Sequence, residues 1–149
     1  MLTYLSCTGF CSVLADVLQE HVQGKRPVML IGYSLGALVI WSALKELARR
    51  DRAGIVDTVI LVAAPIPAAD LEMWEEVTAV VARRVVNCWS DDDWVLAVLH
   101  RIHSLTADIA GLAPVAHPRV ENMDVSKIVN GHQEYKNHME AILKLVGID

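Results

Sequence analysis

Cysteines, aromatic side chains and long apolar runs are all scarce in this sequence, and each scarcity excludes a class of protein. The three cysteines are odd in number and form no C-x-x-C pair, which argues against a disulfide framework and a cysteine metal site. No apolar run approaches the ~20 residues that a membrane-spanning helix needs. The N-terminus lacks a basic region followed by a long apolar stretch, so we expect no signal peptide and a soluble chain.

Basic charge is also in deficit. The net charge is −5, and no basic stripe is present to neutralise phosphates, which argues against nucleic acid as a partner. Aliphatic side chains, by contrast, are abundant: 54% of the 149 residues are hydrophobic although only 5% are aromatic. This composition predicts one domain with a mainly aliphatic core.

Apolar runs that are typical of buried strands alternate with helical patterns along the chain. Residues 8–22 have apolar side chains at helical spacing and are predicted to form the first helix. The strands expected after it are 28–31, 58–62, 84–89 and 120–125, and the helices are approximately 35–50, 68–82, 94–109 and 134–146. Such alternation predicts an α/β fold, with a parallel sheet of about four strands joined by crossover helices.

One short motif indicates chemistry. Gly32-Tyr33-Ser34-Leu35-Gly36 fits the pattern G-x-S-x-G and lies between an expected buried strand and an expected helix. This strand–turn–helix context is what a nucleophile elbow requires, with Ser34 in a strained conformation above the strand ends. We expect Gly32 and Gly36 to let the helix approach the strand closely. The Leu35 amide should point toward a developing oxyanion, aided by the helix N-terminus.

A serine hydroxyl needs a base, and in the α/β-hydrolase order the acid and then the histidine follow the serine. His132 fits best, because it lies between the fourth expected strand and the last helix, next to the flexible Gly131. The other histidines precede Ser34, lie on expected helices or lie before the fourth strand; they are His21, His100, His103, His117 and His138.

The acid is expected in the loop after the third strand, where three aspartates stand in a row. Asp91, Asp92 and Asp93 all qualify by position. At least two of them must have another role, which is to solvate the turn or to cap the next helix. Asp124 is a weaker candidate, because it belongs to the fourth strand.

Segments spread over the chain from Arg26 onward carry a family resemblance. They are residues 26–37, 44–47, 60–65, 87–90, 93–96, 110–112, 120–125, 131–132 and Tyr135. Together they resemble an α/β-hydrolase-like family of transmembrane and coiled-coil domain-containing proteins, which includes a lipase-like fungal protein. The resemblance implies a membrane-associated, intracellular, lipolytic serine hydrolase. It also implies that Asp93 is the acid. In the family pattern an aspartate comes three residues after the small residue that ends the strand, and here Asp93 comes three residues after Ser90.

Compared with a complete α/β-hydrolase, the chain lacks an N-terminal part. In such an enzyme, four or more strands normally precede the strand that leads into the nucleophile elbow, here called the elbow strand. In this chain, residues 1–25 are predicted to form one helix, and residues 26–149 run from the elbow strand to the C-terminal helix. The missing part includes the neighbour of the elbow strand and the loop that supplies the second oxyanion donor. We therefore expect one partial hydrolase domain over residues 1–149. In the family, segments upstream of this part attach the protein to the membrane.

An elbow strand with one neighbour would expose an unpaired edge, so we expect the chain to self-associate or to need its missing half. Val28, Leu30 and the helix around residues 13–18 are the expected contact.

These observations predict hydrolysis of a carboxylic ester, expected to be lipid-like, without a cofactor or a metal. Ser34 would attack the carbonyl, His132 would transfer the proton and Asp93 would orient His132. Two other interpretations stay open. A catalytically inactive, hydrolase-like binding module is favoured by the missing oxyanion loop. Phosphate or nucleotide binding at residues 32–36 is disfavoured, because no lysine follows as in a P-loop.

Overall fold

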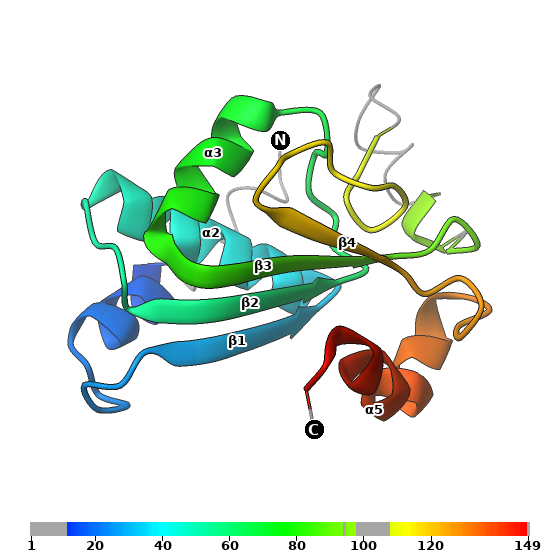
Figure 1. Cartoon of the computed structure of the whole chain (residues 1–149), viewed down its shortest axis with the longest axis horizontal. Helices are drawn as coiled ribbons and strands as arrows, with labels where there is room; N and C mark the ends of the chain where they lie inside the picture. Colours follow the sequence, from blue (N-terminus) through cyan, green and yellow to red (C-terminus); the bar gives the residue numbers. More distant parts are fainter. Residues whose placement is uncertain (1–11, 94, 98–107, 149) are drawn as a thin grey trace.

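The computed structural model of the chain describes residues 12–93, 95–97 and 108–148 (Figure 1). Within them, four parallel strands form one sheet in the order β1-β2-β3-β4. The strands are β1 (Val28–Tyr33), β2 (Val56–Val62), β3 (Val81–Trp89) and β4 (Val120–Asp124). The principal helices are α2 (Leu35–Arg49), α3 (Leu71–Val80) and α5 (Tyr135–Val146). The predicted α/β fold with about four parallel strands is confirmed.

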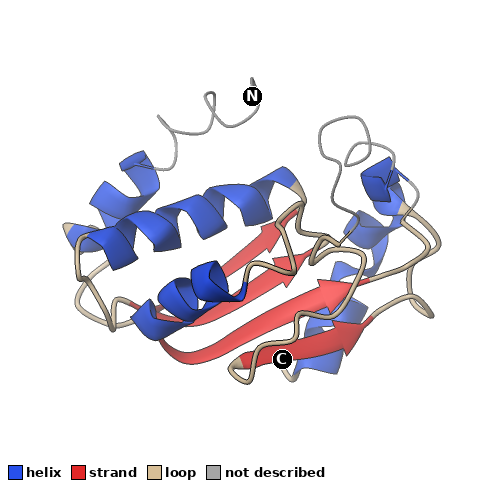
Figure 2. Ribbon diagram, turned by 90° about the horizontal axis from the view of Figure 1, so that it is seen from above, coloured by secondary structure: helices blue, strands red, loops and turns tan. Residues whose placement is uncertain are grey.

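The helices cover both faces of the sheet, with α2 and α3 on one face and α5 on the other (Figure 2). Strand β2 is apolar along most of its length because successive side chains point to opposite faces and enter two separate cores. Val59 and Leu61 pack in the core that contains α2 and α3. Ile60 and Val62 pack in the core that contains α5.

The boundary between α3 and β3 differs from the prediction of a helix over 68–82 and a strand from residue 84. Helix α3 begins after Asp70, whose side chain accepts a hydrogen bond from the Met73 amide at 3.2 Å. It ends at Val80, because Val81 is already extended and pairs with Val56 of β2. The apolar, β-branched pair Val80-Val81 suits either element, and pairing with the sheet decides it.

Two expected helices lie partly outside the described residues. Of the first, residues 12–19 are helical, whereas residues 8–11 are not described. Of the helix expected over 94–109, residues 95–97 are helical, and residues 94 and 98–107 are not described. Its expected end is wrong, because Ile109 forms an isolated bridge with Pro67 instead.

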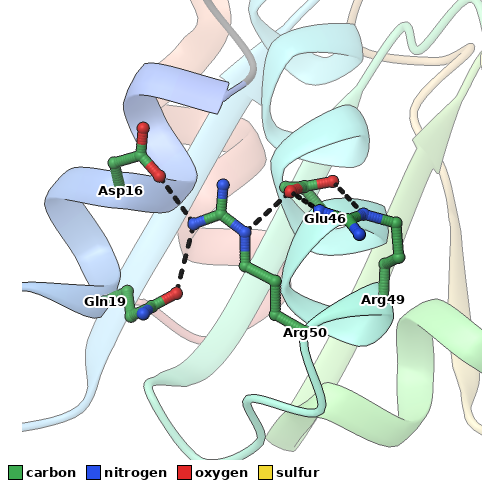
Figure 3. Close-up of polar contacts among 5 residues, drawn as sticks. All are labelled: Asp16, Gln19, Glu46, Arg49 and Arg50. Atoms are coloured by element: carbon green, nitrogen blue, oxygen red, sulfur yellow. Dashed lines mark hydrogen bonds and ion pairs between the residues drawn. The ribbon is translucent and has the colours of Figure 1, made fainter.

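The helical segment 12–19 is attached to the C-terminal half of α2. Ala15 and Leu18 are buried in the core shared with α2 and α3. At the rim of this contact, Arg50 donates to Asp16 at 2.6 Å and to Glu46 at 2.7 Å (Figure 3). The segment therefore packs on α2 and leaves the free side of β1 unpaired among the described residues.

Strand β1 is the edge of the described sheet, as expected, since its sole strand neighbour there is β2. The two strand residues expected at the contact are not the more exposed ones of this strand. Val28 and Leu30 are half-buried against the α2 core, whereas Met29 and Ile31 are 38% and 43% exposed. Ile31 pairs in register with Ile60, so this exposed side belongs to the face that carries α5.

Candidate active site

Ser34 occupies the turn between β1 and α2 in a strained conformation. Its φ of 51° lies in the left-handed region, and its ψ is −115°. Its amide donates to the Val62 carbonyl at 2.9 Å, which fixes the turn against β2. A serine at the start of a helix often caps that helix through its hydroxyl, but Ser34 makes no such bond. The hydroxyl is therefore not used to cap α2.

Gly32 is required by the close approach of α2 to β1. A Cβ at this position would lie 2.7 Å from the Ala37 nitrogen and 2.8 Å from the Ala37 Cα. These are backbone atoms that cannot move without shifting the helix, so the prediction for Gly32 agrees with the structure.

The same expectation for Gly36 is wrong. Apart from its chain neighbours and the backbone of its own helix, no described atom lies within 4 Å of a Cβ built on Gly36, and the residue is exposed. The reason is the rotation of the first turn of α2, which places the buried Ala37 against the strand and turns Gly36 to the outside.

The structure brings together the three residues selected from the sequence for the triad. His132 Nε2 lies 3.0 Å from Ser34 Oγ, and His132 Nδ1 lies 2.6 Å from Asp93 Oδ2. Each residue follows a different strand: Ser34 follows β1, Asp93 follows β3 and His132 comes after β4. Because the carboxyl ends of parallel strands lie at one edge of a sheet, residues far apart in sequence meet there.

Asp93 is fully buried and both of its carboxylate oxygens are engaged. One oxygen contacts His132, and the other accepts the Leu96 amide at 3.0 Å, as a helix N-cap does. Asp91 and Asp92 are exposed, and the Asp92 amide donates to Ser90 Oγ. Among the three adjacent aspartates, Asp93 alone is buried.

Asp124, the weaker candidate for the acid, has a different role. Its carboxylate accepts the Ser126 amide at 2.9 Å in the turn after β4. The side chain of Ser126, and then its backbone amide, lower the pKa of Asp124.

His132 begins a short 3₁₀ helix, His132–Glu134, after Gly131, whose φ of 119° favours glycine. The Tyr33 hydroxyl donates to the His132 carbonyl oxygen. The Tyr33 ring lies 5.1 Å from the imidazole between centroids, and the Tyr135 ring lies 6.1 Å from it. Burial, and then the charge of Asp93, raise the pKa of Tyr33, so its hydroxyl stays a neutral donor.

The remaining described histidines contact other residues or lie in another turn. His117 is buried before β4, where Nε2 contacts Glu75 of α3 at 2.8 Å and Nδ1 accepts the Arg119 amide. His138 lies on α5, 3.5 Å from Glu134, and His21 lies in a turn with a φ of 52°. His100 and His103 lie outside the described residues.

Sequence reasoning missed Gly111 as a packing residue at this edge. A Cβ there would lie 2.5 Å from Leu96 Cδ2 and 2.7 Å from the backbone of Ala63 and Ala64. The Gly111 amide donates to the Ala64 carbonyl, and its carbonyl accepts the Ser90 amide. Gly111 therefore connects the end of β2 to the loop that carries Asp93. In the sequence, Gly111 is a single glycine in a loop, which is only a weak indication of close packing.

Leu35 is the first residue of α2, so the helix provides no acceptor for its amide N–H. A helix N-terminus next to a serine hydroxyl suits negative charge. The Leu35 side chain itself is 60% exposed. Among the described residues, no group of three His, Cys, Asp or Glu side chains is arranged to hold a metal ion.

Residues 6–149 match the model of a family described as a protein of unknown function, DUF726. The chain belongs to this family. It is 45% identical over 133 residues to the transmembrane and coiled-coil domain-containing protein STS1 of Oryza sativa subsp. japonica, covering 89% of this chain and 20% of that protein. It is 40% identical over 139 residues to the uncharacterized membrane protein F35D11.3 of Caenorhabditis elegans, covering 91% of this chain and 22% of that protein.

A further relative carries an activity in its name. The chain is 35% identical over 138 residues to a protein of Saccharomyces cerevisiae named "Probable lipase MIL1", covering 91% of this chain and 13% of that protein. No solved structure matches the chain significantly. The chain thus spans about a fifth or less of the length of these relatives, two of which are named as membrane or transmembrane proteins. Within the described part of the chain, no helix is both long and apolar enough to cross a bilayer.

Proposed function

We propose that this chain is the nucleophile-bearing part of an α/β-hydrolase-type serine esterase, which hydrolyses a lipid-like carboxylic ester. The observation that carries the proposal is the hydrogen-bonded series from Ser34 Oγ through His132 to buried Asp93. A serine nucleophile, a base within hydrogen-bond reach and a group that orients the base are the signature of an activated nucleophile.

The proposed reaction begins with acyl transfer to the serine. His132 Nε2 takes the proton of Ser34 as Oγ attacks the ester carbonyl, and the developing imidazolium is stabilised by Asp93 at Nδ1. The tetrahedral oxyanion would accept the Leu35 amide N–H at the N-terminus of α2. When the intermediate collapses, the C–O bond to the alcohol breaks and His132 gives its proton to the leaving oxygen.

Water completes the reaction in a second half. His132, now neutral, takes a proton from water as the water oxygen attacks the acyl-Ser34 carbonyl. The second tetrahedral intermediate expels Ser34 Oγ, which recovers a proton from His132, and the carboxylic acid leaves. The two halves of the reaction together hydrolyse the ester and restore the chain without a redox step or a cofactor.

A lipid-like ester is supported by two features. The residue beside the nucleophile is Leu35, whose side chain is exposed next to Ser34 and offers apolar contact to an acyl chain. In addition, a relative is named a probable lipase, and other relatives are named as membrane proteins. Ester lipids are the carboxylic esters that a membrane presents in quantity.

A fluorophosphonate probe tests the proposal, because an activated serine displaces its fluoride and becomes phosphonylated irrespective of the natural acyl group. We expect labelling of the wild-type chain at Ser34, located by mass spectrometry of the peptide. Ser34→Ala should abolish the label while retaining the wild-type melting temperature. Ser42→Ala, which alters a half-buried serine within α2, is the matched control and should label normally. An unlabelled wild-type chain, or equal labelling of Ser34→Ala, would favour the inactive binding module.

A further inference from the structure

We propose that Tyr33 is a positioning residue for His132, and this inference rests on the proposed function. The hydroxyl of Tyr33 holds the backbone of His132, and its ring lies beside the imidazole. Tyr33 is a variable position of the G-x-S-x-G pattern, so the motif itself assigns it no role.

The proposal starts from what fixes the imidazole in place. Ser34 and Asp93 engage the two ring nitrogens of His132, but the position of the ring also depends on its backbone. That backbone belongs to a three-residue 3₁₀ helix entered through Gly131, a residue with little conformational restriction. Such a connection does not by itself specify a position to a fraction of an ångström.

The Tyr33 hydroxyl supplies the missing constraint. It donates to the His132 carbonyl oxygen across 99 positions of sequence. Tyr33 directly precedes Ser34, and its own backbone is fixed because it pairs with Val62 of β2. The nucleophile and the anchor of its base are therefore carried by two adjacent residues at the end of one strand. A displacement of that strand end would move both together.

The rings add a second constraint. Tyr33 lies 5.1 Å from the imidazole and 5.5 Å from the Tyr135 ring between centroids, with interplanar angles of 32° and 38°. Tyr135 is fully buried, so this aromatic cluster is supported from the core side. Aromatic faces within about 6 Å attract a cation, so the cluster also favours the imidazolium that forms during proton transfer.

Tyr33→Phe separates the two contributions, because it removes the hydroxyl and keeps the ring. We expect the second-order rate of fluorophosphonate labelling to fall by roughly tenfold to a hundredfold, as small misplacements of reacting groups do. The matched control is Thr78→Val. It removes another buried hydroxyl that donates to a backbone carbonyl, that of Glu75 in α3, outside the site. This control should lose some thermal stability and label at the wild-type rate.

A spectroscopic readout distinguishes positioning from general support of the fold. The proton between His132 Nδ1 and Asp93 Oδ2 lies in a 2.6 Å hydrogen bond, and such protons resonate far downfield in NMR spectra. We expect this resonance to shift upfield or to broaden in Tyr33→Phe and to stay unchanged in Thr78→Val. Unchanged labelling and an unchanged resonance in a folded Tyr33→Phe chain would overturn the inference.

The two readouts also separate this inference from the proposed function. A wild-type chain that does not label at Ser34 contradicts the proposed function, while the resonance still tests whether Tyr33 positions His132. A wild-type chain that labels at Ser34, together with a Tyr33→Phe variant identical in rate and resonance, leaves the esterase standing and rejects the role of Tyr33. A variant that loses melting temperature without a change in resonance has a structural role only, which also rejects it.

Discussion

Asp93 contacts His132 Nδ1 through one carboxylate oxygen at 2.6 Å and caps the following helix through the other, which accepts the Leu96 amide at 3.0 Å. Helix capping and orientation of the proposed base appear as alternatives for the aspartates in the sequence, yet here one residue makes both contacts. The cap holds the carboxylate still, because it fixes one oxygen while the other faces the imidazole. Orientation of His132 by Asp93 is therefore linked to the fold of the loop after β3.

The first prediction concerns the position of the acid. Asp93→Asn keeps a side-chain oxygen that can cap the helix but removes the charge beside His132, so the wrong imidazole tautomer becomes accessible. We expect the labelling rate at Ser34 to fall on the order of 10³- to 10⁴-fold, as when the aspartate of a triad is neutralised. Asp91→Asn and Asp92→Asn change exposed residues and are the controls. Greatest sensitivity at position 92 would show that the acid lies one residue earlier.

The second prediction contrasts the two glycines of the motif. Gly32→Ala places a Cβ 2.7 Å from backbone atoms of α2, so we expect a loss of roughly 1–3 kcal/mol or more in the free energy of unfolding. Gly36→Ala enters open space in the first turn of α2 and should stabilise the helix by up to ~1 kcal/mol. Urea denaturation measures both changes. Equal destabilisation by the two variants would contradict the packing described for this turn.

The contrast between these glycines shows which kind of feature a sequence can predict. Strand β2 was predictable from its largely apolar run, a local pattern that burial on both faces imposes. Strand β1 shows the same apolar pattern, although Met29 and Ile31 are exposed at the edge of the described sheet. The G-x-S-x-G pattern correctly places a turn before α2, but which glycine is crowded depends on the rotation of the helix. That rotation is set by packing against β1, which no local pattern records.

Contacts between distant segments account for the rest of what the sequence did not reveal. Val80 and Val81 suit a helix and a strand equally, so only the pairing of Val81 with Val56 ends α3 there. The hydroxyl of Tyr33 meets its acceptor 99 positions away, and a tyrosine in a motif carries no sign of this. By contrast, Ser34 and His132 could be selected, because the motif, chain order and the ends of parallel strands restrict where a triad can lie. Position alone restricted the acid to Asp91, Asp92 or Asp93, and the family resemblance then favoured Asp93.

The third prediction concerns Glu46, near the C-terminal end of α2. Its partner Arg50 also contacts Asp16 of the segment 12–19, so these ion pairs lie where that segment attaches to α2. Hydrogen bonds from Arg49 and Arg50 lower the pKa of Glu46 from 4.5 to about 2. A carboxylate whose pKa is lower in the folded state stabilises the fold above its ordinary pKa, and this stabilisation is lost as the pH falls from about 4.5 to 2. Glu46→Gln should therefore be less stable at pH 6 and should lose less stability on acidification than the wild type.

Urea unfolding at pH 6 and pH 3 measures that difference, and 1 M salt should reduce it because the partners are partly exposed. Lys144→Gln is the matched control, because its ion pair with Glu140 on α5 is highly exposed and should contribute little. A pH dependence identical to that of the wild type would mean that Glu46 is not held as a carboxylate by the two arginines.

The last prediction concerns the free edge of β1. Its residues 28–33 include no charged side chain, and backbone groups along such an edge can pair with a strand of another molecule. Met29 and Ile31 add exposed apolar surface on the face that carries α5. We expect the isolated chain to self-associate at micromolar concentration, which light scattering detects. Lysine is a common means of protecting a sheet edge, so Ile31→Lys should shift the chain toward the monomer.

Leu145→Lys is the control for this last prediction. It introduces the same charge at an exposed apolar residue of α5, outside strand β1, and should leave the association unchanged. An equal effect of both variants would attribute association to apolar surface in general and not to the strand edge. A wild-type chain that stays monomeric and unfolds cooperatively would reject the prediction outright. Because Ile31 lies three residues before Ser34, labelling of the Ile31→Lys monomer also tests whether an unpaired β1 still presents an activated serine.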